Sequence, residues 1–287
     1  MEKAIFPIFK EYWFEQKGEK LEFIATFAGS GEITKKVLKK FPAEVAVLSS
    51  KLDVWHLSTH GISAIRPYND QPYLGIVART PLVMLVDKNN LNIITNYIDL
   101  KNAPGKIILP DPVTSGAGQL GILSIYGSAR NEGNTGVEAI QVLKNVWHKI
   151  DVTPSCAREA LESYKHGKGN ILITYEANLL TNPKHKAVPG HIEYPRSTII
   201  CEPIAISIER NIVPKQKELV NTFIQFLWSP EVQKALVDYG FQSVDKNLNI
   251  SRTDFGYIQE PFTIDSLESC LELKKIIDTI VLESSKQ

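Results

Sequence analysis

The chain has 287 residues, of which 43% are hydrophobic and 22% charged, and this balance excludes a disordered or fibrous protein. Its 32 basic residues cancel its 32 acidic ones, which argues against a general nucleic-acid binder and against a polybasic membrane-surface protein. The three cysteines, Cys156, Cys201 and Cys270, are widely spaced, so neither a disulfide framework nor a metal-binding pair is indicated.

Apolar residues at helical or strand spacing define the predicted elements. The first third of the chain predicts a helix at 4–14, a strand at 21–27, a helix at 32–40, a strand at 45–48, a helix at about 53–60, a loop at 66–72 and a strand at 75–86. The middle predicts a helix at 89–101, a strand at 106–109, a helix starting near 115, helices at 137–149 and 158–164, and a strand at 171–176. The last part predicts a strand at 199–208 and helices at 218–227, from 230 to before 240, and at 267–282.

This alternation of strands and helices is typical of an α/β protein with mainly parallel sheets. Pro81, inside the strand pattern at 75–86, favours a sheet edge or a crossing between two lobes. With a second long apolar strand at 199–208, it predicts two crossing strands and a discontinuous first lobe. The expected division is residues 1–84 with 203–287 in lobe 1, and residues 85–202 in an inserted lobe 2.

Two glycine-containing stretches precede helical patterns, at residues 27–32 and 111–119. Pro112 ends the preceding segment, Thr114 or Ser115 is suited to cap the helix, and the glycines permit close approach of a ligand to the backbone. Neither stretch has the Gly-Lys-Ser/Thr ending of a nucleotide phosphate loop. The alternatives are ordinary capped helix starts or the two halves of one anion site.

Catalytic and metal-binding patterns are weak. His56 and His60 have a zinc-compatible spacing, but no third ligand is evident, and a solvated helix face is the simpler interpretation. Ser115 has no partner that spacing identifies as a base. We therefore assign no catalytic residue, no metal site and no cofactor from the sequence. No run approaches the ~18 apolar residues of a membrane span, and the start shows no signal-peptide pattern.

Seven segments, in order, resemble the sulfate-binding proteins of ABC importers, and the likeness extends over about residues 4–265. They are 27–32 (FAGSGE), 42–49 (PAEVAVLS), 111–118 (DPVTSGAG), 156–159 (CARE), 173–178 (ITYEAN), 201–205 (CEPIA) and 226–233 (FLWSPEVQ). The resemblance implies the two-lobed periplasmic-binding-protein fold of the second type. It also implies capture of sulfate or a similar tetrahedral oxyanion between the lobes and delivery to a membrane permease, by a monomer.

The residues that the resemblance assigns to the anion are Ser30, Ser115, Gly116, Ala117, Ala157 and Tyr175. They supply hydroxyl and backbone N–H donors, which suit a fully ionised oxyanion. Donors without acceptors would also favour sulfate over a phosphate that carries a proton. The family implies a periplasmic or membrane-anchored extracellular location for the native protein.

Three departures from the family pattern leave alternatives open. Tyr175 stands where the family usually has tryptophan and is reminiscent of molybdate- and tungstate-binding relatives, so thiosulfate, molybdate and tungstate remain candidate ligands. Glu44 replaces the usual aspartate. Family members also begin with a strand whose loop contributes donors, and this sequence is expected to start after it. An enzyme on the same fold and a signalling or scaffold domain are the other classes considered.

Overall fold

The computed structural model describes residues 1–62, 71–88, 94–180 and 188–284. The helices are α1 (Ile5–Lys17), α2 (Ser30–Leu38), α3 (Lys51–Thr59), α4 (Gly116–Asn131), α5 (Gly136–Trp147), α6 (Ala157–Lys165), α7 (Glu176–Leu179), α8 (Lys217–Phe226), α9 (Pro230–Asp238), α10 (Lys246–Asn249) and α11 (Cys270–Ser284). The strands are β1 (Val45–Leu48), β2 (Thr80–Val86), β3 (Ile107–Ile108), β4 (Ile150–Val152), β5 (Ile171–Tyr175), β6 (His191–Glu193), β7 (Ser197–Cys201), β8 (Ile204–Ser207) and β9 (Glu260–Phe262).

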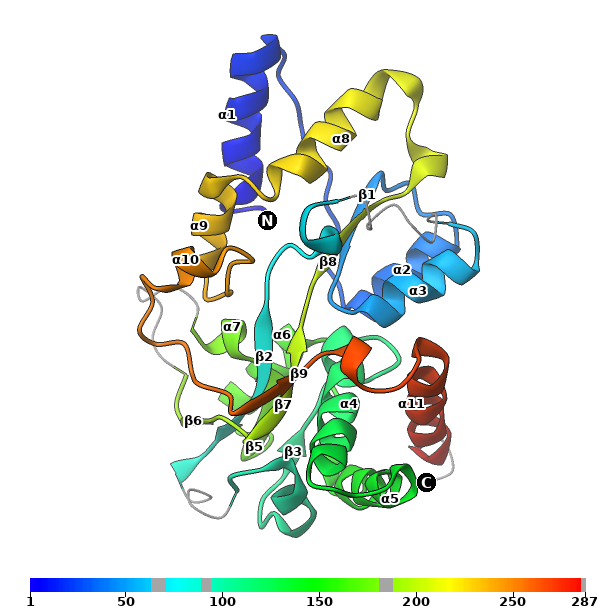
Figure 1. Ribbon diagram of the computed structural model, residues 1–287, viewed down its shortest axis with the longest axis vertical. Coiled ribbons are helices and arrows are strands. Elements are labelled where there is room, and N and C mark those ends of the chain that lie inside the picture. Colours follow the sequence, from blue (N-terminus) through cyan, green and yellow to red (C-terminus); the bar gives the residue numbers. More distant parts are fainter. Residues whose placement is uncertain (63–70, 89–93, 181–187, 285–287) are drawn as a thin grey trace.

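The chain forms an upper and a lower part, which are joined by the segments at β2, at β7–β8 and between α10 and β9 (Figure 1). In the upper part, β1 pairs antiparallel with β8. In the lower part, the strands follow the order β4-β3-β5-β2-β7-β9, and β6 also pairs with β2. Helices flank both sheets, so the α/β class expected from the sequence is confirmed.

Strand directions are mixed rather than mainly parallel. The β3–β4, β3–β5 and β7–β9 pairs are parallel, whereas β2 runs antiparallel to each of its partners. The reason is that β2 enters the lower sheet from the upper part, against the direction of the strands that follow it. The apolar pattern predicted at 199–208 divides into β7 and β8 at Glu202 and Pro203, because proline has no N–H to continue a ladder.

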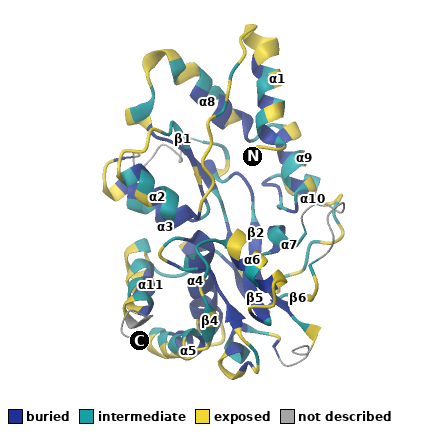
Figure 2. Cartoon of the chain, turned by 180° about the vertical axis from the view of Figure 1, so that it is seen from behind, coloured by how far each residue is buried: buried dark blue, intermediate teal, exposed yellow. Residues whose placement is uncertain are grey.

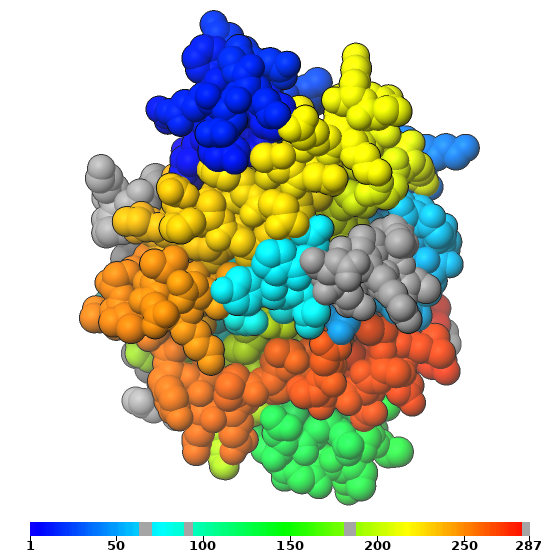
Figure 3. Space-filling model, turned by 45° about the horizontal axis from the view of Figure 1, so that its top comes forward, coloured from blue at the N-terminus to red at the C-terminus, as the bar shows by residue number. Residues whose placement is uncertain are grey.

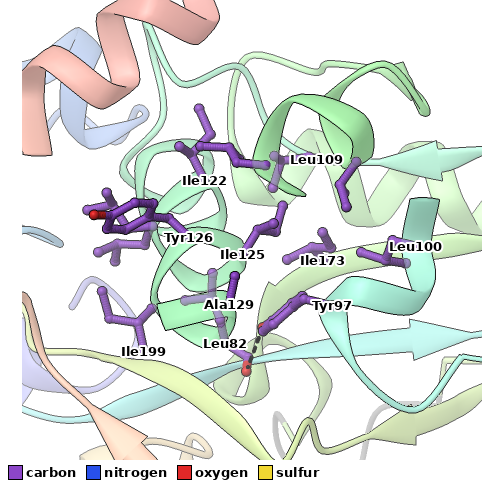
Figure 4. Packing of buried hydrophobic residues seen from close by; sticks show 14 of the residues in the cluster. Leu82, Tyr97, Leu100, Leu109, Ile122, Ile125, Tyr126, Ala129, Ile173 and Ile199 are labelled. Atoms are coloured by element: carbon purple, nitrogen blue, oxygen red, sulfur yellow. Dashed lines mark hydrogen bonds between the residues drawn. The ribbon is translucent and has the colours of Figure 1, made fainter. Parts of the chain in front are cut away.

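The lower core lies between the sheet and α4. Its largest fully buried side chain is Tyr97, whose hydroxyl donates to the Leu82 carbonyl at 3.2 Å and lies 2.9 Å from Thr198 Oγ1. Ile125 of α4 lies toward Ile173 of β5 in the same cluster (Figure 4). Figure 2 shows that burial is continuous along α4 and β5. This rigid core fixes the N-terminal end of α4, where the candidate site begins.

The upper core has a separate aromatic cluster. Phe9 of α1 is fully buried, with ring centroids 5.0 Å from Phe223 and 5.2 Å from Phe226 of α8. Phe23 stacks on Phe6 at 4.1 Å. The strand predicted at 21–27 is wrong, because this segment forms no ladder with any described strand and Ile24 is wholly exposed. Leu21 and Phe23 of this segment pack on the cluster of α1 and α8 instead.

The C-terminal segment, expected in lobe 1, packs on the lower part. β9 pairs with β7, and Leu273 and Ile277 of α11 belong to the same cluster as α4 and α5. Figure 3 shows this segment, in orange and red, next to the green of α4 and α5. The lobe boundaries themselves stay a prediction.

The strand predicted at 75–86 begins only at Thr80, after a 3₁₀ helix at Pro72–Gly75, and two further predicted segments lie partly outside the described residues. The helix predicted at 89–101 is a 3₁₀ helix at Tyr97–Asn102, and its first part, at 89–93, lies outside the described residues. Most of the loop predicted at 66–72 also lies outside them. Among the helices that the structure describes, none is both long and apolar enough to cross a membrane.

Candidate functional site

The N-terminal ends of α2 and α4 face each other across the junction of the two parts. α2 begins at Ser30 after the N-cap Gly29, and α4 begins at Gly116 after the N-cap Ser115. The backbone N–H of Glu32, in the first turn of α2, donates to the Thr114 carbonyl at 3.0 Å. The two glycine-containing stretches singled out in the sequence are therefore brought together.

This close approach depends on glycine. A Cβ on Gly29 would lie 2.2 Å from the Thr114 carbonyl oxygen, and a Cβ on Gly116 would lie 2.2 Å from Ser49 Oγ and 3.0 Å from Ser30 Cβ. Real side chains do not tolerate such distances. The residues around the two helix starts are largely excluded from solvent, since Ser30, Ser115 and Ala117 are 8%, 2% and 2% exposed.

A third helix start lies beside the first two. α6 begins at Ala157, and the preceding Ser155 carbonyl accepts a hydrogen bond of 2.8 Å from Thr114 Oγ1. The same carbonyl would lie 3.1 Å from a Cβ on Gly29. The unsatisfied N–H groups of a helix start carry partial positive charge. The N–H groups of three helix starts therefore converge on one region. None of the six residues assigned to the anion is a lysine or an arginine.

Tyr175 ends β5, and its hydroxyl is buried without a hydrogen-bond partner. Burial, with a smaller effect from Cys201, raises the pKa of Tyr175 well above its usual value, so the hydroxyl keeps its proton. Ser49 and Cys201 lie near it but do not accept that proton with hydrogen-bonding geometry. A buried donor without an acceptor costs free energy unless a ligand supplies the acceptor, and an oxygen of a bound oxyanion would do so.

Three residues at this junction were missed by the sequence reasoning: Ser49, Asp53 and Gln119. Ser30 Oγ donates to Asp53 Oδ2 at 2.5 Å, and the Ser49 backbone N–H donates to Ser30 Oγ at 3.2 Å. Gln119 Nε2 of α4 reaches Asp53 Oδ1 at 3.5 Å. Ser49 could have been identified from the sequence, because it directly follows β1 and polar residues at the carboxyl ends of strands commonly bind ligands.

Asp53 places one acceptor next to the expected donors. This carboxyl is only 3% exposed, because the first turn of α3 places it beneath Ser30, where Ser50 caps the helix start. Burial raises its pKa, against hydrogen bonds from Ser30, Gln119 and Thr34. The region thus combines several donors with one buried acceptor.

The two crossing segments are joined to each other by an ion pair. Arg79 Nε donates to Glu202 Oε1 at 2.9 Å, which links the approach to β2 with the β7–β8 junction. A small cavity of about 70 Å³ opens beside Ser49 and is lined by Leu120 and Glu202, among others. Lys51 and Asp265 also line this cavity, whereas none of the six residues assigned to the anion does.

Other candidate chemistry does not gather at this site. His60 Nδ1 lies 2.9 Å from the His56 carbonyl oxygen, and the two rings meet edge to face at 4.8 Å on the surface of α3. Within residues 1–62, 71–88, 94–180 and 188–284, no group of three metal-binding side chains occurs. The three cysteines are free thiols, and Cys201 Sγ donates to the Ser49 carbonyl at 3.1 Å.

Two sheet-and-helix parts joined by crossing strands, with helix starts converging between them, define the two-lobed periplasmic-binding-protein fold of the second type. The solved structure of the sulfate-binding protein SubI from Mycobacterium tuberculosis H37Rv matches this fold with a TM-score of 0.79 and 20% sequence identity, covering 92% of this chain and 93% of that chain.

The chain belongs to the family of bacterial extracellular solute-binding proteins, whose family model matches residues 1–242. A sulfate-binding protein from Synechocystis sp. (strain ATCC 27184 / PCC 6803 / Kazusa) is 29% identical over 251 residues, which is 86% of this chain and 70% of that protein. A sulfate-binding protein from Synechococcus elongatus (strain ATCC 33912 / PCC 7942 / FACHB-805) is 26% identical over 272 residues, which is 92% of this chain and 76% of that protein.

Proposed function

We propose that this protein captures sulfate, or a closely similar tetrahedral oxyanion, between its two parts and delivers it to the membrane permease of an ABC importer. The observation that carries the proposal is the buried Tyr175 hydroxyl without a partner, near Ser49 and Asp53, which lie beside the starts of α4 and α2. The names of the two cyanobacterial relatives support sulfate as the ligand.

The physical chemistry of the site favours a fully ionised oxyanion. Helix N-termini present N–H groups and partial positive charge, and charge-assisted hydrogen bonds are stronger than neutral ones. Neutral dipoles also avoid the desolvation of a buried cation. We therefore assign binding to the hydroxyls of Ser115 and Tyr175 and to the backbone N–H groups of Ser30, Gly116, Ala117 and Ala157.

Closure of the two parts around the ligand, expected from the sequence near residues 82–86 and 200–205, would take place near residues 77–79 and 202–203, because residues 82–86 pair with β5 and β6 inside the lower sheet. A short connection of this kind absorbs a hinge rotation with little change in the packed cores. The half-buried Arg79–Glu202 pair lies at this connection and favours one relative orientation of the two segments. We propose that the protein acts as a monomer, outside the cytoplasmic membrane, and without catalysis.

Isothermal titration calorimetry on the full chain at neutral pH tests the proposal, with sulfate, thiosulfate, molybdate and tungstate as ligands. Sulfate is expected to bind most tightly, and absence of heat with all four would remove the proposal. A preference for molybdate or tungstate would support the alternative that Tyr175 suggests.

Paired serine variants of α4 test the site. Ser115→Ala is expected to weaken sulfate binding about tenfold or more, since a hydrogen bond to a charged group contributes roughly 1.5–3 kcal/mol. Ser124→Ala is the control, because Ser124 is buried on the same helix and its hydroxyl makes no hydrogen bond. Equal affinities of the two variants would contradict the assignment of Ser115.

A further inference from the structure

A buried carboxyl directly follows Tyr175 in the chain. Glu176, the first residue of α7, is 0% exposed. Its Oε1 accepts the Gly256 backbone N–H at 2.8 Å, and its Oε2 accepts from Gln242 Nε2 at 3.2 Å. Both donors belong to the stretch of chain that leads from α9 in the upper part to β9 in the lower part. One side chain of the lower part therefore holds this stretch at two points.

The contact with Gln242 extends to the place where the two parts are joined. The backbones of Gln242 and Arg79 each donate an N–H to the carbonyl of the other, at 2.8 Å in both directions. Arg79 lies where we expect the hinge, and its Nε donates to Glu202 Oε1 at 2.9 Å. Through Gln242, Glu176 is thus joined to the connecting segments at β2 and at β7–β8.

The contact with Gly256 holds the third connecting segment, between α10 and β9. This segment packs tightly, since a Cβ on Gly256 would lie 1.9 Å from the Tyr194 ring. Burial raises the pKa of Glu176, and hydrogen bonds from Gly256, Tyr194 and Gln242 oppose this rise. All three connecting segments are therefore linked to one buried carboxyl.

These contacts fix the end of β5 that carries Tyr175. Tyr175 itself pairs with Leu82 in the β2–β5 ladder. Immediately after it, the Ala177 backbone N–H donates to the buried Thr80 Oγ1 at 3.0 Å. Glu176 anchors the same turn to the connecting segments. The position of the Tyr175 hydroxyl relative to the upper part therefore depends on the Glu176 carboxyl.

We propose that Glu176 is a positioning residue for sulfate capture, which anchors the turn after β5 to the connecting segments and so holds the Tyr175 hydroxyl against the anion as the two parts close. Tyr175 donates to the anion, and Glu176 acts through it. This inference rests on the proposed function and adds a residue outside the six that are assigned to the anion. A residue that only stabilised the fold would affect sulfate affinity independently of Tyr175.

A double-mutant cycle between Glu176→Ala and Tyr175→Phe tests this coupling, with sulfate affinity measured by calorimetry on the full chain at neutral pH. Glu176→Ala is expected to weaken sulfate binding about tenfold in the wild-type chain. In Tyr175→Phe the same change should weaken it less than about twofold, because the donor that Glu176 positions is already absent.

The outcomes separate this inference from the proposed function. Equal losses in both backgrounds, or no loss in either, would overturn the role of Glu176. An unchanged affinity in Tyr175→Phe alone would overturn it as well, because no donor would then be positioned. Absence of sulfate binding to the wild-type chain would instead overturn the proposed function.

Two further variants control for folding. Glu272→Ala is the matched control, because the Glu272 carboxyl also accepts a backbone N–H, from Ser269 at 3.1 Å, but within a single helix start. Its sulfate affinity is expected to equal that of wild type. If Glu176→Ala does not fold, Gln242→Leu replaces it in the cycle, since this change removes one donor and keeps the Glu176 carboxyl. Its expected loss of about threefold or more should likewise disappear in Tyr175→Phe, and a loss that persists there would contradict the inference.

Discussion

Gly116 and Ser49 touch where the two parts of the molecule meet, so closely that a Cβ on Gly116 would lie 2.2 Å from Ser49 Oγ. Gly116→Ala is therefore expected to hold the start of α4 away from Ser30 and to weaken sulfate binding at least about tenfold, which corresponds to 1.4 kcal/mol. Calorimetry measures the affinity, and circular dichroism confirms that the variant folds.

Gly136→Ala provides a matched control for this change. Gly136 is also the first residue of a helix, but a Cβ there would meet only the Tyr126 hydroxyl at an ordinary 3.5 Å. Unchanged affinity in Gly136→Ala beside a loss in Gly116→Ala would assign the effect to close approach at the site. Similar losses in both would indicate a general consequence of adding a methyl group at a helix start.

Tyr175→Phe separates ligand binding from stability. The hydroxyl is buried and makes no hydrogen bond in the unliganded protein, so its removal is expected to leave the melting temperature unchanged or to raise it. Sulfate affinity should nevertheless fall about tenfold, because a donor to the anion is lost. Thermal unfolding and calorimetry on the same sample give both quantities.

Tyr97→Phe is expected to show the reverse behaviour. The Tyr97 hydroxyl donates to the Leu82 carbonyl and lies 2.9 Å from Thr198 Oγ1 in the lower core. Its loss should lower the free energy of unfolding by about 1–3 kcal/mol, with sulfate affinity unchanged. If Tyr175→Phe resembled Tyr97→Phe, the role of Tyr175 would be structural.

Much of the site could be predicted because its signals are local. Gly29 with Ser30, and Ser115 with Gly116, mark helix starts through their own conformational preferences, although the structure shows no side-chain cap at either start. Asp53 could not be identified in this way, since a carboxylate in the first turn of a helix is ordinary in sequence. Its importance depends on burial beneath Ser30, which only the packing of α3 against α2 creates.

Parts of the fold escaped prediction for a related reason. The pattern at 21–27 suits a strand, but a strand also needs a neighbour, and the described residues offer this segment only the aromatic faces of α1 and α8. Likewise, the apolar face of α11 shows that it covers a core without showing which one. Which strand a segment pairs with, and which core a helix covers, depend on contacts between residues far apart in the sequence. The pattern within one element does not predict these contacts.

Phe9→Ala tests how α1 is held to the upper part. The Phe9 ring is fully buried among Phe223, Phe226 and Phe23, so its removal should lower the free energy of unfolding by about 3–5 kcal/mol in urea. Phe14→Ala, on the same helix but 50% exposed, is the control and should change it by about 0.5 kcal/mol or less. Equal losses would mean that the aromatic cluster does not anchor α1.

The buried carboxyl of Asp53 should also be visible in the stability of the unliganded protein. Because burial raises its pKa, the folded chain holds this proton more tightly than the unfolded chain does. Its contribution is therefore fully present below the ordinary aspartate pKa and is lost as pH rises through the folded-state value. The melting temperature of Asp53→Asn minus that of wild type is expected to increase from about pH 4 to pH 8.

Glu138→Gln provides a control of opposite sign. Hydrogen bonds from Thr135 lower the pKa of Glu138, so this variant should be less stable than wild type at neutral pH and should approach the stability of wild type as pH falls. A constant difference for Asp53→Asn across this range would show that Asp53 titrates alike in the folded and unfolded chains.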